Sequence, residues 1–123
     1  VSLLFDNAPG PENERGFVVR KENRRDVSAM AGLREQLLSP DLTDDFEVLL
    51  VVHEAGASLE EAKIRDTLEV VYLISGRLDL VIAGRSFKVA AGDSFRVRGE
   101  AFQWFNPYPE PTTAIWVISP TIY

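Results

Sequence analysis

Residues 56–76 read GASLEEAKIRDTLEVVYLISG, a stretch with a glycine at each end and one acid, Glu69, inside an apolar run. The run Leu68–Ile74 is rich in β-branched and aromatic side chains, which favour a strand. Gly76 follows this run, and a second apolar run begins at Leu78. Because glycine readily adopts the positive φ that tight turns need, the two runs predict a β-hairpin.

The rest of the chain consists of further short apolar runs separated by turn residues. Many short strands with closely spaced turns are typical of an all-β sandwich or barrel. Gly32–Leu38 is ambiguous between strand and helix, and Val27–Leu38 is the only place for a helix of ordinary length. Proline removes ladder donors, so residues 106–111 are expected to form a loop. Besides the hairpin, strands are expected at residues 17–20, 46–53, 86–90, 94–98, 102–105 and 112–118.

The composition restricts the class of protein. At 123 residues, with 46% apolar and 26% charged residues, the chain fits one soluble globular domain. Its net charge of −6 is a poor electrostatic match for phosphate backbones, so the chain itself is not expected to bind DNA. It has no cysteine, and no apolar run approaches the roughly 20 residues of a membrane span. The lack of cysteine is compatible with a reducing compartment, and no membrane partner is expected.

The N-terminal end differs in composition from the rest of the chain. Residues 6–16 are rich in proline, glycine and polar side chains, which cannot bury enough apolar surface to order themselves. We interpret residues 1–16 as a linker or arm and residues 17–123 as one β-domain. The short apolar patch Val1–Phe5 is either the end of a preceding element or a strand that docks onto the domain.

The spacing within residues 56–76 resembles the first motif of the cupin family, which has the form G-x5-H-x-H-x4-E-x6-G. Gly56, Glu69 and Gly76 stand at the motif spacing. The second cupin motif ends in H-x3-N, and here Asn106 closes the stretch that begins at Phe102. The resemblance implies a double-stranded β-helix, the jelly-roll barrel of RmlC-like cupins.

The histidines that bind metal in many cupins are missing from the matching positions. Ala62, Ile64 and Phe102 stand there instead, so Glu69 is the one ligand that remains. One carboxylate cannot hold a transition metal tightly, since such ions take several nitrogen or oxygen donors. We therefore expect no metal and no other cofactor. Because alternate residues of a strand share a face, Ala62 and Ile64 are expected to point together into the barrel.

In more detail, residues 46–123 are similar to the C-terminal sensor domain of bacterial regulators that join an XRE-type helix-turn-helix to a cupin. The similarity lies in Leu37–Pro40 before the barrel, Gly92–Phe95 after the hairpin, and the closing Trp116–Pro120. Val1–Phe5 resembles the stretch after the last DNA-binding helix. The similarity implies a non-enzymatic homodimeric domain that binds a small-molecule effector. The transcription factor would contact DNA through an N-terminal domain outside this chain.

The resemblance also implies a set of pocket residues. Glu69 would accept a hydrogen bond from a ligand amine, hydroxyl or amide, or would form a structural pair with an arginine or tyrosine, since buried carboxylates need partners. Phe102 and Trp104 alternate on one strand, so they would clasp the ligand together or simply fill the barrel. The expected ligand-binding residues are Ala62, Ile64, Glu69, Phe102, Trp104 and Trp116.

Two other functions are compatible with the sequence. A metal-free cupin enzyme, such as an isomerase or epimerase, would need a general acid or base, for which Glu69, Tyr72 or His53 could serve. A purely structural dimerisation module would have a filled barrel. His53 is the single histidine and lies off the motif positions, which favours a structural or surface role. Apolar residues on both faces of Val70–Ile74 suggest that a partner sheet covers one side.

Overall fold

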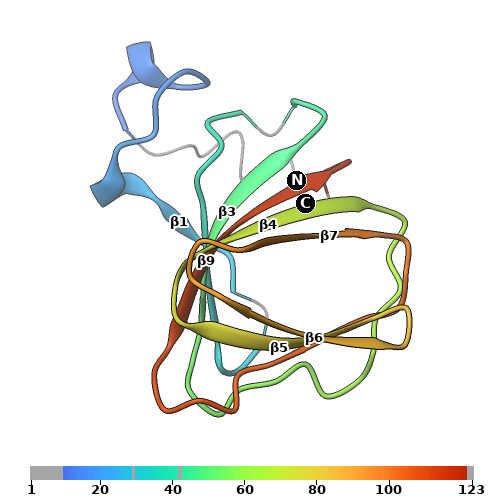
Figure 1. Cartoon of the computed structure of the whole chain (residues 1–123). Coiled ribbons are helices and arrows are strands. Elements are labelled where there is room, and N and C mark those ends of the chain that lie inside the picture. Colours follow the sequence, from blue (N-terminus) through green and yellow to red (C-terminus); the bar gives the residue numbers. More distant parts are fainter. Residues whose placement is uncertain (1–9, 29, 42, 122–123) are drawn as a thin grey trace.

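The computed structural model describes residues 10–28, 30–41 and 43–121, which form a β-barrel of two facing sheets (Figure 1). Its strands are β1 (Arg25–Asp26), β2 (Leu33–Leu37), β3 (Glu47–His53), β4 (Leu68–Ser75), β5 (Arg77–Ile82), β6 (Arg85–Ala90), β7 (Ser94–Arg98), β8 (Phe102–Phe105) and β9 (Thr112–Ser119). Two short 3-10 helices, η1 (Glu12–Glu14) and η2 (Lys21–Asn23), precede them. Within the described part of the chain, no helix could traverse a bilayer.

The larger sheet has the strand order β1-β2-β3-β9-β4-β7, and the smaller sheet has the order β6-β5-β8. The paired strands run antiparallel throughout the described residues. Strand β9 comes last in the chain and yet lies in the middle of the larger sheet, between β3 and β4. This arrangement confirms the predicted all-β jelly-roll barrel.

The hairpin predicted across Gly76 is wrong: β4 pairs with β7 and β9, whereas β5 pairs with β6 and β8. The turn at Gly76 instead carries the chain from the larger sheet to the smaller one. The φ of Gly76 is +86°, in the left-handed region that favours glycine. An added Cβ would lie 2.8 Å from the carbonyl oxygen of Pro111 and would also collide with the hydroxyl of Thr112. That hydroxyl ties the start of β5 to β9, because it accepts the N–H of Arg77 at 2.8 Å and donates to the Arg77 carbonyl oxygen at 2.7 Å.

One expected strand does not form, and one segment of ambiguous sequence is a strand. The strand expected at residues 17–20 is wrong: the N–H groups of Phe17 and Val18 both donate to the carbonyl oxygen of Glu14, so the backbone turns locally instead of joining a sheet. Phe17 is 81% exposed. The ambiguous stretch around β2 is a strand, because pairing with β3 satisfies its backbone and buries Leu37. The apolar patch expected at residues 1–5 lies outside the described residues.

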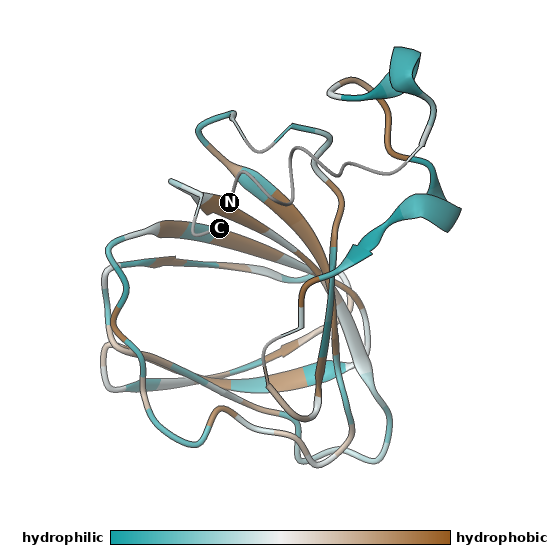
Figure 2. Ribbon diagram, turned by 180° about the vertical axis from the view of Figure 1, so that it is seen from behind, coloured by the Kyte–Doolittle hydropathy of each residue, from teal (hydrophilic) through white to brown (hydrophobic). Residues whose placement is uncertain are grey.

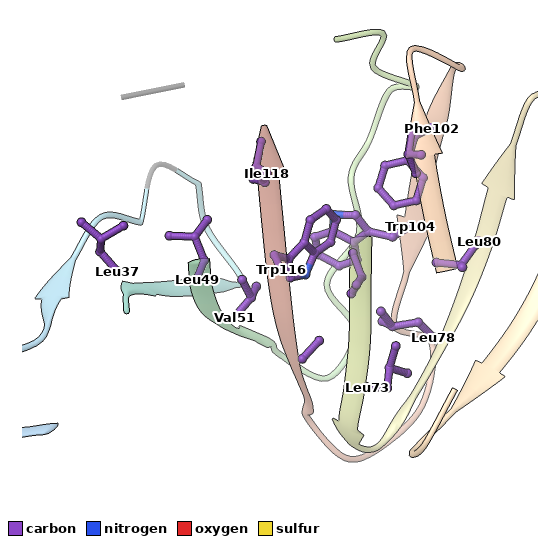
Figure 3. Packing of buried hydrophobic residues seen from close by; sticks show 13 residues of the cluster. Leu37, Leu49, Val51, Leu73, Leu78, Leu80, Phe102, Trp104, Trp116 and Ile118 are labelled. Atoms are coloured by element: carbon purple, nitrogen blue, oxygen red, sulfur yellow. The ribbon is translucent and has the colours of Figure 1, made fainter. Parts of the chain in front are cut away.

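Alternate side chains of the larger sheet point into the barrel, as the two-residue period of a strand requires. Figure 3 shows that they pack together with residues of the smaller sheet, such as Leu78 and Leu80 of β5. The buried residues of the three central strands are Glu47, Leu49, Val51 and His53 on β3, Glu69, Val71 and Leu73 on β4, and Thr112, Ala114, Trp116 and Ile118 on β9.

The opposite face of these strands is apolar as well, and Figure 2 shows hydrophobic residues along the larger sheet. Val70, Tyr72 and Ile74 of β4 are each nearly half exposed. A solvated antiparallel sheet normally carries polar residues on its outer side, so this surface has the composition of a contact surface. We name it the outer apolar face. It comprises Val48, Leu50 and Val52 of β3, Val70, Tyr72 and Ile74 of β4, and Ile115 and Val117 of β9.

Candidate ligand pocket

A cavity of about 390 Å³ opens inside the barrel, with walls from both sheets. The interior is therefore hollow at one end instead of being packed solid. Most of the lining is hydrocarbon or aromatic with a few polar groups, which is the usual composition of a small-molecule site. The lining residues are Met30, Leu33, Glu35, Leu49, Val51, His53, Leu59, Lys63, Arg65, Glu69, Val97, Glu100, Phe102, Trp104, Trp116 and Ile118.

Glu69 lies inside the barrel on β4, as predicted, and is only 4% exposed. Its Oε2 accepts a hydrogen bond from the Thr67 hydroxyl at 2.8 Å. Its Oε1 has no hydrogen-bond partner among the described residues. The structural pair considered for Glu69, with an arginine or a tyrosine, is not formed; a neutral hydroxyl contacts one oxygen only. Glu69 therefore brings to the cavity a carboxylate oxygen that no protein group satisfies.

Aromatic rings form another part of the cavity wall. Figure 3 shows Trp116 of β9 close to Phe102 and Trp104 of β8, so the three predicted aromatic residues come together. The rings of Phe102 and Trp116 are T-shaped with centroids 5.9 Å apart, and Phe95 of β7 lies 6.0 Å from Trp116. The rings of Phe102, Trp104 and Trp116 line the cavity without filling it, and Phe95 packs behind them outside the lining. The indole Nε1 of Trp116 is buried and has no hydrogen-bond partner among the described residues.

His53, for which a structural or surface role was expected, lines the cavity. It is fully buried at the end of β3, with its ring edge-on to Trp104 at 4.7 Å between centroids. Its Nδ1 lies 3.2 Å from the carbonyl oxygen of Thr112, and a carbonyl only accepts, so Nδ1 carries the proton. Burial lowers the pKa of His53 to about 4, so the ring is neutral. Nε2 is then a lone-pair acceptor, without a partner among the described residues.

Two cations line the cavity where apolar side chains were expected. Lys63 and Phe102 form an antiparallel bridge in which each N–H donates to the other's carbonyl oxygen at 2.8 Å. Residues directly opposite in such a bridge point to the same side, so Lys63 lines the cavity together with Phe102. Arg65, two residues further on, lines it too. Within the described residues neither side chain forms an ion pair.

The expectation that Ala62 and Ile64 point into the barrel is wrong. Both are exposed, Ile64 at 75%, and neither lines the cavity. The physical reason is that a shift of one residue moves every side chain of an extended segment to the opposite face. Counting back in steps of two from the buried Glu69 leads to Arg65 and Lys63. This two-residue alternation, counted from Glu69, is the sequence signal that could have identified Lys63 and Arg65 as lining residues.

The residues around the cavity do not fit a transition metal. Such an ion needs several nitrogen, oxygen or sulfur donors at about 2.0–2.3 Å. Across residues 10–28, 30–41 and 43–121, no group of three or more His, Cys, Asp or Glu is placed to hold one. Lys63 and Arg65 line the cavity instead, and their charges would repel a metal ion.

Two facing antiparallel sheets and a hollow, aromatic-lined interior define a double-stranded β-helix barrel. The sequence profile described as "Cupin domain" matches residues 49–118. The chain belongs to the cupin family. A search of curated proteins finds none that matches.

Solved structures share this fold. An RmlC-like cupin from Shewanella frigidimarina NCIMB 400 is 20% identical with a TM-score of 0.74, over 86% of this chain and 92% of that one. The cupin domain of an XRE family transcriptional regulator from Enterobacter cloacae is 22% identical with a TM-score of 0.61, over 72% and 96%. A cupin sugar phosphate isomerase from Silicibacter pomeroyi DSS-3 is 25% identical with a TM-score of 0.63, over 75% and 62%. A regulator domain and an enzyme thus both share the barrel.

Proposed function

We propose that this chain is the small-molecule effector-binding domain of a helix-turn-helix transcriptional regulator. The observation that carries the proposal is the cavity, whose apolar wall contains polar atoms that no protein group satisfies. These are Oε1 of Glu69, Nε2 of His53 and Nε1 of Trp116. A buried polar group without a partner costs free energy that a bound molecule would recover. The likeness to the cupin domain of an XRE family regulator supports the regulatory role.

The effector would act on DNA through a linked equilibrium. A ligand shifts a protein between two states only if it binds them with different affinities. DNA would be contacted by a helix-turn-helix domain N-terminal to this chain, since a domain with a net charge of −6 is itself a poor match for phosphates. Such a regulator would work in the cytoplasm, where the chromosome of a bacterium lies.

A metal-free isomerase or epimerase is the alternative function. It is favoured by the presence of both His53 and Glu69 at the cavity and by the likeness to a cupin sugar phosphate isomerase. A general base works best when its pKa is near the working pH. Burial lowers the pKa of His53 to about 4 and encloses its Nε2, so this ring is a weak base. We therefore rank ligand binding ahead of catalysis.

A variant with a blocked cavity should lose ligand binding. Leu59 lines the cavity from the segment between β3 and β4 and is not part of the fully buried core, so Leu59→Trp would occupy ligand space at small cost to folding. A metabolite library screened by thermal shift should contain compounds that stabilise the wild-type chain. A ligand at 100 times its Kd stabilises a protein by about 2.7 kcal/mol. This stabilisation should disappear in Leu59→Trp.

Ile64→Trp is the matched control for the blocked variant. Ile64 lies on the same segment as Leu59 but is exposed outside the cavity, so the control adds the same bulk without filling ligand space. It should keep the full thermal shift with each ligand. Shifts that persist in Leu59→Trp would show binding elsewhere on the chain, and a broad library without any stabilising compound would reject effector binding.

We further propose that the domain forms a homodimer through the outer apolar face. Its residues are in register across three strands, so that Val48, Val117 and Val70 lie in one row and Leu50, Ile115 and Tyr72 in the next. A regular apolar surface of this kind can pack against its own copy about a two-fold axis. Stable homodimer contacts are also more apolar than the rest of a protein surface.

Ile74→Asp should dissociate the proposed homodimer, because the contact would then bury an unpaired carboxylate. Sedimentation of the wild-type chain should give twice the chain mass of 13.7 kDa, and the variant should give the chain mass itself. Phe87→Asp is the control, because Phe87 is a comparably exposed aromatic residue on β6 of the smaller sheet. A monomeric wild-type chain, or equal dissociation by both variants, would reject the outer apolar face as the interface.

A further inference from the structure

The cavity carries unpaired charges of both signs in different environments. Glu69 is almost completely buried, and only its Oε2 has a partner. Lys63 and Arg65 are exposed at the part of the lining that reaches solvent, and neither has an ion-pair partner among the described residues. A ligand therefore meets a negative charge inside the barrel and two positive charges toward its opening.

The buried end of the cavity favours a ligand group that is rich in hydrogen-bond donors. Oε1 of Glu69 is an acceptor without a hydrogen-bond partner among the described residues. A buried carboxylate is costly unless a positive charge or several donors reach it. The faces of Trp104 and Trp116, which line the same cavity, also attract cations. An ammonium group supplies both the donors and the charge.

The open end of the cavity favours a carboxylate. The guanidinium of Arg65 can hold both oxygens of a carboxylate in its planar fork, and Lys63 adds a second positive charge on the same face. The other lining acids already have protein partners: Oε1 of Glu100 accepts the N–H of Arg98 at 2.5 Å, and Glu35 is also engaged. They therefore leave the two cations available.

The wall between these ends is mostly hydrocarbon, from residues such as Leu33, Val51 and Leu59. A sugar or polyol would leave its hydroxyls without partners against such a wall. A diamine would place its second ammonium beside Lys63 and Arg65, and a simple organic acid would gain nothing from Glu69. Like charges placed side by side cost free energy.

We propose that the cavity binds a zwitterion with a hydrocarbon body, that is, a free amino acid. Its ammonium contacts Glu69 inside the barrel, and its carboxylate contacts Lys63 and Arg65 at the opening. This assignment rests on the proposed effector-binding function and names the chemical class of the effector. It also gives the buried carboxylate of Glu69 a positively charged partner.

Calorimetric titration with matched probes tests the assignment. The probes are L-leucine and 6-aminohexanoate, each compared with the amine that lacks its carboxylate (isopentylamine, pentylamine) and with the acid that lacks its amine (4-methylpentanoate, hexanoate). At least one zwitterion should bind the wild-type chain. Each loss of one charged group should weaken binding tenfold or more, since a hydrogen bond to a charged group contributes about 1.5–3 kcal/mol.

Two variants assign the charges to residues. Glu69→Gln keeps the shape of the side chain and should weaken the zwitterion and the amine about tenfold, while leaving the acid unchanged or tighter. The double variant Lys63→Met with Arg65→Gln should weaken the zwitterion and the acid and leave the amine unchanged. Arg98→Gln is the control for lost positive charge, because Arg98 lies on β7 but does not line the cavity. It should bind all probes like the wild-type chain.

The outcomes separate this inference from the proposed function. If neither zwitterion binds, or the uncharged amide 4-methylpentanamide binds as well as L-leucine, the amino-acid assignment is wrong. Effector binding itself would still stand if other library compounds bind and Leu59→Trp abolishes their binding. If no compound of any class binds the wild-type chain, both the assignment and the proposed function fail.

Discussion

Gly76→Ala is expected to lower the free energy of unfolding by about 2–5 kcal/mol, the sum of a left-handed backbone at about 1–2 and overpacking at about 1–3. The φ of Gly76 is +86°, and an added Cβ would lie 2.8 Å from the Pro111 carbonyl oxygen and from Cα of Thr112. Both are backbone atoms where β9 begins, so they cannot rotate away. Urea unfolding followed by circular dichroism measures the loss directly.

Gly84→Ala separates the two contributions to this loss. Gly84, in the turn between β5 and β6, has a φ of +77°, but an added Cβ there would meet nothing within 4 Å. This control should lose only the backbone contribution of about 1–2 kcal/mol. Equal losses in the two variants would show that the close approach of Thr112 to the turn between β4 and β5 does not contribute to the loss of stability.

The second large effect concerns pH: between pH 7.5 and 5 the chain should lose about 2 kcal/mol of stability through His53. Burial lowers the pKa of His53 from 6.5 to about 4 in the folded chain. The unfolded chain therefore takes up the proton first as the pH falls. The contribution of the neutral ring is complete above pH 6.5 and is lost progressively between pH 6.5 and 4. Urea midpoints measured at half-unit pH steps would follow this loss.

His53→Asn is the control for the pH effect. Its amide can still donate to the carbonyl oxygen of Thr112, as Nδ1 of His53 does, but it cannot take up a proton. The variant should be less stable than the wild-type chain and nearly flat from pH 7.5 to 5, a window above the usual carboxylate range. A wild-type slope no steeper than that of the variant would show that His53 is not kept neutral by the fold.

Much of the barrel could be predicted because its signals are local. The β-branched run Leu68–Ile74 and the glycine after it specify a strand and a turn without reference to the rest of the chain. The predicted pairing of the two strands across this turn was wrong, because their partners β9 and β6 are chosen by the whole barrel. Asn106 was also singled out, but its task depends on distant partners. Its Nδ2 donates to the carbonyl oxygens of His53 and Glu110, each at 3.0 Å, and so joins the end of β3 to the loop before β9. Contacts between residues that are far apart in the chain leave no signal in the spacing of residues within a sequence motif.

The site residues that lie on regular strands could be predicted from the sequence. Glu69, Phe102, Trp104 and Trp116 lie on β4, β8 and β9, whose alternation is simple, and all four line the cavity. The cations come from residues 54–67, which form only isolated bridges. The pairing of Lys63 with Phe102 decides which side chains of that segment face the cavity, and this pairing joins distant parts of the chain. His53 was expected in a structural or surface role, or as a general acid or base in an enzyme. Its place in the cavity wall follows from the pairing of β3 with β9, which the sequence alone does not give.

The central position of β9 has a consequence for biosynthesis. A growing polypeptide emerges from the ribosome N-terminus first, so β3 and β4 are available well before the strand that separates them in the sheet. Until Ser119 has emerged, each of these apolar strands has an open edge that can pair with another chain. Translation therefore includes an interval in which the nascent domain is prone to aggregate. The larger sheet can be completed only once β9 has emerged.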